Sequence, residues 1–192
     1  RQAAIQSIGE IGGPEARDAL VRILETYTDR GPEFIRQIWE DGRYTSVLNS
    51  TINELRKWRG NPHVAGLLEH IALRGEDGLY VHHMREIACS ALVENEMDAA
   101  GSHSREARAA YLLAHISGLG VGHEHDWVEG KSGVKTVRAI RNSAMVDLLV
   151  SYGPDVLPLV QARLRQTSVA AEEYREALQV IRRRIQTGTR QQ

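Results

Sequence analysis

The densest group of side chains that could do chemistry is GHEHDW, residues 122–127. It places two imidazoles and two carboxylates at successive positions, His123, Glu124, His125 and Asp126. Side chains alternate along an extended chain, so in an extended loop the two histidines point the same way and an acidic residue can add an oxygen. Imidazole nitrogens and carboxylate oxygens are ligands that zinc takes in proteins. A metal site is therefore one hypothesis for this segment.

The histidines support this hypothesis by their number rather than by their spacing. Six of the eight lie between residues 82 and 125, and His115, on the helix predicted before the loop, can reach toward His123 and His125. No ligand spacing typical of a known metal site constrains these three residues. We therefore predict no metal and no cofactor, and keep His115, His123 and His125 as metal-ligand candidates for an alternative enzymatic function.

Trp127 provides a second hypothesis for the same segment. Residues 118–134 hold five glycines and show no helical period, and connections longer than about 8 residues in helical arrays are often functional. An exposed Trp supplies much contact area with little loss of entropy. We expect residues 123–127 to be an accessory contact for a partner with Trp127 as its anchor, unless Trp127 folds back and pins the loop.

Other kinds of catalytic site find no support in the sequence. GKS at 130–132 would need a Gly at position 125 to complete a Walker loop, and GLG at 118–120 would need one at position 123 for the dinucleotide pattern, but both positions are His. Cys89 lies in an apolar helical stretch and is predicted to be a core residue rather than a nucleophile. We predict no catalytic residue.

Composition indicates a folded, soluble protein. The 42% share of hydrophobic residues is ordinary, and no window reaches the roughly 18 apolar residues that a membrane span needs. The single cysteine cannot form an internal disulfide, which favours a reducing compartment and a cytoplasmic location. The chain opens at Arg1 directly in a helical pattern, so we expect it to be a fragment of a larger protein.

The elements around the loop follow a repeat. SIGEIGGPEARDALVRIL, NELRKWRGNPHVAGLLEHIA and VDLLVSYGPDVLPLVQARL each read as a helix, a Gly-containing turn, a Pro and a second helix. Their prolines, Pro14, Pro62 and Pro154, are 48 and 92 residues apart, and 92 is twice 46. The missing copy is expected between the last two, where a helix without Pro begins after an N-cap at Ser102 or Ser104. Helix pairs at such a period indicate an α-solenoid.

The turns and the apolar spacing support the repeat. Pro is tolerated in a first helical turn, and the residue before it closes the preceding helix, as expected for Gly13-Pro14, Asn61-Pro62 and Gly153-Pro154. Apolar residues recur three and four positions apart, which predicts one buried stripe per helix. The stripes of the second helices include Ala16, Leu20, Leu24, Val64, Leu68, Ile71, Val156 and Val160, and that of the last helix includes Tyr174, Leu178, Ile181 and Ile185.

The stretch RQAAIQSIGEIGGPEARDALVRIL resembles a HEAT repeat of the short bacterial type, also found in phycobilisome lyases, and the later copies keep the pattern with longer linkers. The resemblance implies an all-α fold, an α-solenoid with a right-handed superhelix, that serves as a recognition scaffold. It does not imply lyase activity, because fold does not fix function. The expected helix pairs cover residues 1–27, 44–75, 80–118 and 135–166, with a long loop at 119–134 and a capping helix at 169–186.

The resemblance does not extend to the HEAT-type di-iron hydroxylases. Those enzymes carry paired His-Glu steps at the starts of helices, whereas this chain has Arg85-Glu86 in the comparable place. His123-Glu124 is such a step, but it lies in a predicted loop.

Charge is distributed unevenly. Residues 1–134 hold 14 Lys and Arg against 20 Asp and Glu, and residues 135–192 hold 10 against 5. The basic part can bind an acidic partner or simply complement neighbouring helices. For an alternative nucleic-acid-binding function, the candidate phosphate contacts are Arg138, Arg141, Arg163 and Arg165. We interpret Arg182, Arg183 and Arg184 as charges that oppose the helix dipole in a last turn.

These observations favour a non-enzymatic scaffold or regulatory domain. Its partner is predicted to be a protein, or another domain of its own longer chain, held by shape and charge along the inner surface of the second helices. No membrane partner is expected. Nucleic-acid binding through the basic C-terminal part and a metal-dependent enzyme built on the His-rich loop remain alternatives.

Overall fold

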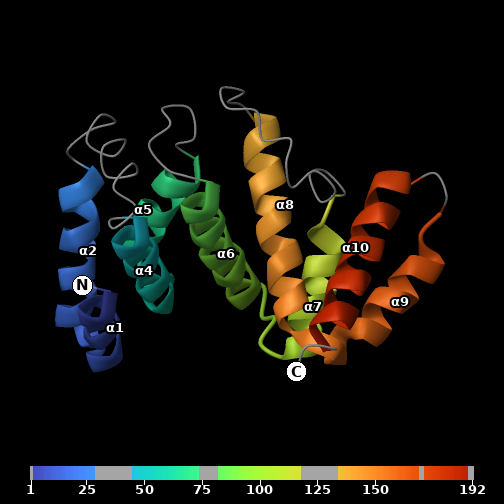
Figure 1. The fold of residues 1–192 in the computed structure, drawn as a ribbon, viewed down its shortest axis with the longest axis horizontal. Helices are drawn as coiled ribbons and strands as arrows, with labels where there is room; N and C mark the ends of the chain where they lie inside the picture. Colours follow the sequence, from blue (N-terminus) through green and yellow to red (C-terminus); the bar gives the residue numbers. More distant parts are fainter. Residues whose placement is uncertain (1, 29–44, 74–81, 118–133, 169–170, 190–192) are drawn as a thin grey trace. The chain divides into compact units, whose positions relative to one another are not determined.

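Helices make up nearly all of the chain that the computed structural model describes, namely residues 2–28, 45–73, 82–117, 134–168 and 171–189 (Figure 1). These ranges contain no strand, so the predicted all-α class is confirmed for them. The α-helices are α1 (Gln2–Ile11), α2 (Gly13–Thr28), α4 (Thr45–Leu55), α5 (Pro62–Leu73), α6 (His82–Ala99), α7 (Arg105–His115), α8 (Val134–Ser151), α9 (Leu157–Gln166) and α10 (Glu172–Thr189), and the 3₁₀ helices are η1 (Arg56–Trp58) and η2 (Gly153–Val156).

The chain divides into two compact units, residues 1–92 and 93–192, and α6 runs from the first into the second. In the first unit α1, α2 and α4 pack against one another. Its core contains the apolar residues that recur three and four positions apart, which confirms the predicted stripes there. Its largest fully buried side chains are Leu20, Leu24, Leu48, Ile52, Leu55, Leu68 and Ile71. Burying one such side chain contributes about 1.5–3 kcal/mol.

Gly9 sets the approach of α1 to α4. It is buried, and a Cβ at this position would lie 1.9 Å from the Glu54 carboxylate. Lys57 donates to the Gly9 carbonyl at 3.4 Å and forms an ion pair with Glu54. A side chain at position 9 would therefore require the Glu54 carboxylate, and with it the ion pair to Lys57, to move.

The second unit has one core, formed by α10 packed on α8, α9 and η2, and by α7 packed on α8 and α9. The predicted stripe of the last helix faces this core, with Leu178, Ile181 and Ile185 buried and Tyr174 packed against it. The other buried members are Val93, Met97, Ala109, Leu112, Leu113, Ile116, Met145, Val146, Leu148, Leu149, Val156, Val160 and Ala177.

Two of the three predicted Pro turns have the expected backbone. Gly12 and Gly13 have φ of 69° and 81°, and Gly153 has φ of 72°, the left-handed region in which side chains are disfavoured. Each is followed at once by a new helix with Pro in its first turn, Pro14 in α2 and Pro154 in η2. Glycine therefore both ends one helix and redirects the chain into the next.

The third turn works by a different device. No residue other than Gly has positive φ in the described chain, so Asn61 does not close the preceding helix in this way. Instead its Oδ1 accepts hydrogen bonds from the amides of His63 and Val64, at 3.1 and 3.3 Å. Asn61 is thus the N-cap of α5.

The helix predicted without a Pro, α7, is capped by Ser104. Its hydroxyl oxygen accepts a hydrogen bond from the amide of Ala107 at 3.1 Å, which confirms one of the two caps expected from the sequence.

The interpretation of Arg182–Arg184 as a last-turn charge is wrong. The final helix begins at Glu172 and continues to Thr189, beyond the expected end at residue 186, so its last turn holds no basic residue. Because the dipole effect falls off within one turn, it does not account for three arginines at this place. Their environment must be found in the tertiary structure.

No single described helix is long and apolar enough to cross a membrane. One bent pair, Ala139–Ser151 with Gly153–Gln166 at 108°, satisfies length and composition together.

Candidate binding site

The partner-binding loop lies outside the described residues. His123, Glu124, His125, Asp126 and Trp127 all fall in the segment 118–133, so their predicted role as a partner contact, like the metal alternative, stays a prediction.

The segment before that loop is anchored by a buried amide. Asn142 on α8 is 1% exposed, donates from Nδ2 to the Ser117 hydroxyl at 2.9 Å, and accepts from the Ser117 backbone amide at 3.1 Å. Sequence reasoning missed this residue. The available signal was an amide residue on the same helical face as Ala139, Met145 and Val146, where a buried polar group needs a partner.

His115, a metal-ligand candidate, makes local contacts. Its ring stacks on Tyr111 with centroids 4.0 Å apart, and its Nδ1 lies 2.8 Å from the Tyr111 carbonyl. Among the described residues no group of three His, Cys, Asp or Glu side chains is arranged to hold a metal.

A polar cluster joins α6, α7 and α8 around Glu96. Arg141 donates from Nη1 to one carboxylate oxygen at 2.8 Å and from Nη2 to the other, and the Tyr111 hydroxyl lies 3.3 Å from the second. The hydrogen bonds from Arg141 lower the pKa of Glu96 against the opposing effect of burial. Burial and the neighbouring carboxylate raise the pKa of Tyr111. Arg141, a candidate for phosphate contact, thus has a carboxylate partner within the fold.

The remaining nucleic-acid candidates lie in three different situations. The side chain of Arg138 is outside the described residues. Arg163 is exposed and donates from Nε to the Tyr174 hydroxyl at 3.2 Å, and that hydroxyl donates to the Leu113 carbonyl at 2.5 Å. Arg165 is exposed and lines a groove.

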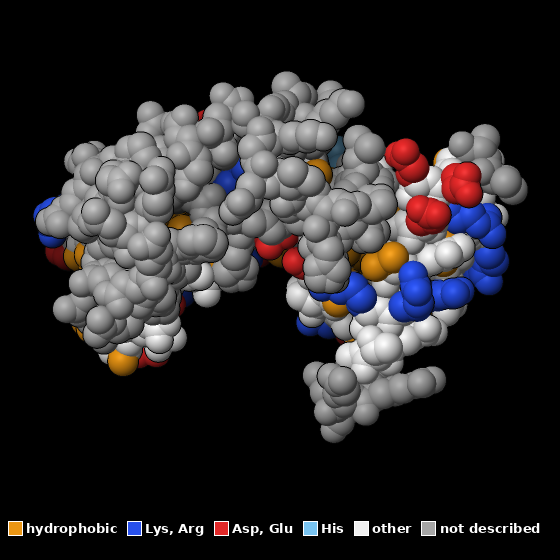
Figure 2. All heavy atoms as spheres, turned by 45° about the horizontal axis from the view of Figure 1, so that its top comes forward, with side chains coloured by type: hydrophobic (Ala, Val, Ile, Leu, Met, Phe, Trp, Pro, Cys, Tyr) orange, Lys and Arg blue, Asp and Glu red, His pale blue; other side chains and the backbone are white. Residues whose placement is uncertain are grey.

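This groove lies between α9 and α10 and has a volume of about 380 Å³. The lining residues of each helix are three or four positions apart, so they lie on one face of α9 and on one face of α10. The lining residues are Gln161, Leu164, Arg165, Arg175, Gln179 and Arg182, which we call the arginine groove. Figure 2 shows Lys and Arg side chains gathered at the right of the view, where α9 and α10 lie, beside a group of Asp and Glu.

Among the described residues, the arginine groove is lined by three arginines and by no acidic residue. Arg175 donates to the Thr167 carbonyl at 3.4 Å. The Nε of Arg182 is buried and has no hydrogen-bond partner among the described residues. Two positions further along α10, Arg184 lies 2.7 Å from the Asp147 carboxylate. The groove is therefore a concentration of positive charge suited to an anionic group from outside.

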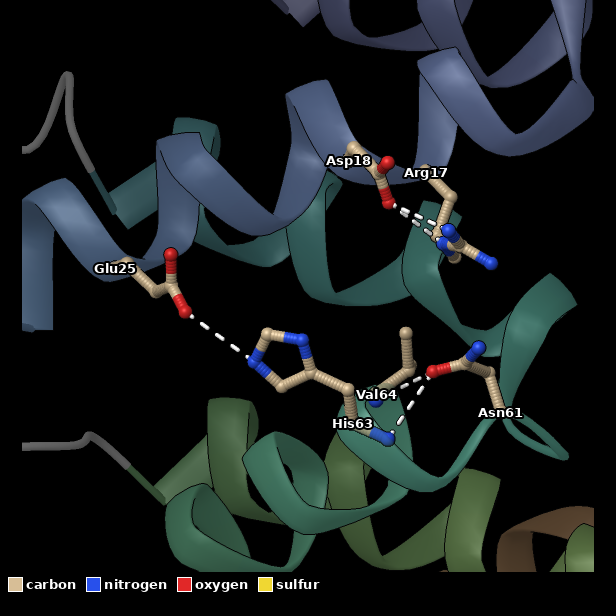
Figure 3. A network of polar contacts seen from close by, with 6 residues as sticks. All are labelled: Arg17, Asp18, Glu25, Asn61, His63 and Val64. Atoms are coloured by element: carbon tan, nitrogen blue, oxygen red, sulfur yellow. Dashed lines mark hydrogen bonds and ion pairs between the residues drawn. The ribbon is translucent and has the colours of Figure 1, made fainter.

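The second helices of the first unit are linked by a polar contact. The imidazole of His63 at the start of α5 lies 3.3 Å from the Glu25 carboxylate on α2 (Figure 3). In the second unit Arg105 at the start of α7 lies 2.5 Å from the Asp155 carboxylate in η2, just before α9. Both pairs are largely exposed and contribute less than about 1 kcal/mol each. They nevertheless show which helices are neighbours.

Arg85, near the start of α6, has a structural role. It is 6% exposed, and its Nε donates to the Ala72 carbonyl at the end of α5 at 3.0 Å. Burial lowers the pKa of its guanidinium. Cys89, one turn later on α6, is buried, as the sequence predicts for a core residue.

Comparisons of the chain with models of known protein families, with curated proteins and with solved structures gave no match.

Proposed function

We propose that this chain is a HEAT-like helical scaffold that binds a protein partner or an adjacent domain of its own protein. The proposal is supported by the succession of helix pairs joined by short turns that contain a glycine with positive φ, α1 with α2, α6 with α7, and α8 with η2 and α9. In repeat proteins such pairs bury their apolar stripes against the next pair and leave an extended surface for recognition.

The observation that carries the proposal concerns the order of the helices inside each unit. The first helix of one pair lies beside the first helix of the next pair, and the second helix lies beside the next second helix. In the first unit α1 packs on α4, and the Glu25–His63 contact links α2 to α5. In the second unit the Glu96–Arg141 pair links α6 to α8, and α7 packs on α9. This is the order expected when successive helix pairs stack in register.

The second helices offer a mixed, exposed surface in the first unit. Arg22, Glu25, His63 and Glu69 all project from α2 and α5 and are exposed or partly exposed. Interspersed charges of both signs favour recognition of a protein surface, because they give specificity through complementary potentials. We therefore assign the partner to the face of the second helices.

Site-specific photo-crosslinking in native cells tests this assignment. A photoreactive amino acid replaces Arg22 or Glu69, both exposed on second helices, and a matched control replaces Glu10, exposed on the first helix α1. We expect a crosslink from both second-helix positions and none from Glu10, detected as a new protein band for a separate partner or as a crosslinked peptide by mass spectrometry for an adjacent domain. Absence of any crosslink at the second helices, or equal crosslinks at all three positions, would contradict the proposal.

A further inference from the structure

We propose that the arginine groove between α9 and α10 binds an acidic peptide segment, with Arg165, Arg175 and Arg182 holding its carboxylates. This inference rests on the proposed function, because it names the chemistry of a protein partner. It assigns the acidic segment of that partner to a surface separate from the second helices of the first unit.

The charge of the arginine groove is the first argument. Three arginines line one groove of about 380 Å³, and none of the described residues that line it is acidic. A guanidinium presents parallel N–H groups that match a carboxylate in a bidentate manner. The groove therefore complements side chains of Asp or Glu.

The state of the other arginines in the same unit is the second argument. Arg141, Arg184 and Arg105 each have a carboxylate partner, in Glu96, Asp147 and Asp155. Neither Arg165 nor Arg182 has an ion pair among the described residues, and Arg182 also has a buried Nε without a partner. A carboxylate from another molecule would give the groove arginines the kind of ion pair that Arg141, Arg184 and Arg105 form within the fold.

The uncharged lining residues favour a peptide over a nucleic acid. Single-stranded nucleic acids are held by aromatic side chains that stack on the bases, and the groove has no aromatic lining residue. Gln161 and Gln179 can each donate to and accept from peptide backbone groups, and Leu164 gives an apolar contact. The combination of these groups with arginine suits an extended acidic segment that also carries an apolar residue.

Fluorescence anisotropy with the whole chain tests the inference. The probe is a labelled peptide of Glu and Leu, compared with the same peptide with Gln for Glu and with a single-stranded oligo-dT. We expect saturable binding of the Glu peptide that weakens about tenfold or more in Arg165→Glu, because reversing one charge of a complementary pair removes an attraction and adds a repulsion. The matched control Arg183→Glu reverses an exposed charge on α10 that does not line the groove and should change the affinity less than about threefold.

Each other result has a defined meaning. Equal losses in Arg165→Glu and Arg183→Glu, or equal binding of the Gln peptide, would overturn the inference. Tighter binding of oligo-dT with the same dependence on Arg165 would overturn it in favour of a nucleic acid. Thermal melts by circular dichroism verify that both variants fold. If the Glu peptide fails to bind while the crosslinks at Arg22 and Glu69 persist, the inference about the arginine groove is wrong and the proposed scaffold function is unaffected. If the Glu peptide binds and the crosslinks fail, the proposed scaffold function is wrong.

Discussion

Arginine has different roles in the cluster around Glu96 and in the arginine groove. In the cluster Arg141 meets a carboxylate brought to it by another helix, and the pair joins α6 to α8. In the groove Arg165 on α9 and Arg182 on α10 both line the surface, and no described lining residue carries a carboxylate. An arginine in this fold is therefore structural or available for binding according to whether packing places an acid beside it.

The largest expected effect comes from removing the support of the groove. Leu178, on the apolar face of α10, is fully buried, and Leu178→Ala should lower the free energy of unfolding by about 2–5 kcal/mol, because it leaves a cavity where α10 packs. Chemical denaturation followed by circular dichroism measures it. The control Glu176→Ala, exposed on the same helix, should stay within about 0.5 kcal/mol. Similar losses for the two variants would mean that α10 is not held by its apolar face.

A smaller loss is expected at the loop anchor. Asn142→Leu keeps the size of the side chain but leaves the Ser117 amide without its acceptor, which costs about 1–3 kcal/mol. Ser117→Ala, which removes only the hydroxyl, should cost less. Equal stability of wild type and Asn142→Leu in denaturant titrations would show that the amide is satisfied in another way.

The Glu96–Arg141 pair should contribute about 1 kcal/mol or less. Its side chains are 42% and 34% exposed, so solvent screens a large part of the attraction. A double-mutant cycle with Glu96→Gln and Arg141→Gln isolates the coupling of the two side chains. A coupling energy near zero would mean that Arg141, like the groove arginines, does not stabilise the fold through an ion pair, and the difference between the two regions would disappear.

The same pair predicts the direction of a pH dependence. Because the pKa of Glu96 is lowered in the fold, its contribution is complete above the unfolded-state pKa of about 4.3 and is lost as the pH falls through the lower folded value. The stability difference between wild type and Glu96→Gln should therefore shrink on acidification below about pH 4. A difference that grows toward low pH would refute the assigned sign.

The smallest effect is expected at the groove itself. Arg165→Gln should change the free energy of unfolding by less than about 0.5 kcal/mol, because no described residue depends on that charge. Comparing the losses of stability in Arg165→Gln and in Arg141→Gln under the same conditions measures the difference between a groove arginine and a paired arginine. A loss at Arg165 as large as that at Arg141 would mean that the groove arginine is structural.

Much of the local structure could be predicted because its causes are local. The four-residue spacing of Ala16, Leu20 and Leu24 indicates a buried helical face wherever the helix packs. Gly153 before Pro154 and Ser104 at the start of α7 act through their own backbone and neighbouring amides. The cap formed by Asn61 escaped prediction because Asn can serve either end of a helix, and the backbone angles decide which.

The candidate sites were far less predictable. Arg141 and Arg165 are alike in sequence and were grouped as candidate phosphate contacts, yet the partner of Arg141 lies 45 residues earlier in the chain. The groove combines residues of two helices, and no local pattern marks which face of α9 meets which face of α10. The prediction for Arg182–Arg184 is wrong because α10 continues past its last buried residue, Ile185, through the exposed residues 186–188, and the apolar stripe alone does not mark where the helix ends.

That this chain forms helices, where most of them begin and end, and which side of each is apolar could be predicted from the order of the residues, because these properties depend on interactions within a few residues. Which arginines meet a carboxylate, and which line a groove without one, depends on how the helices pack against each other. The reason is physical: whether a charge is paired depends on distances of a few ångströms between helices, and such distances are set by how the buried side chains pack.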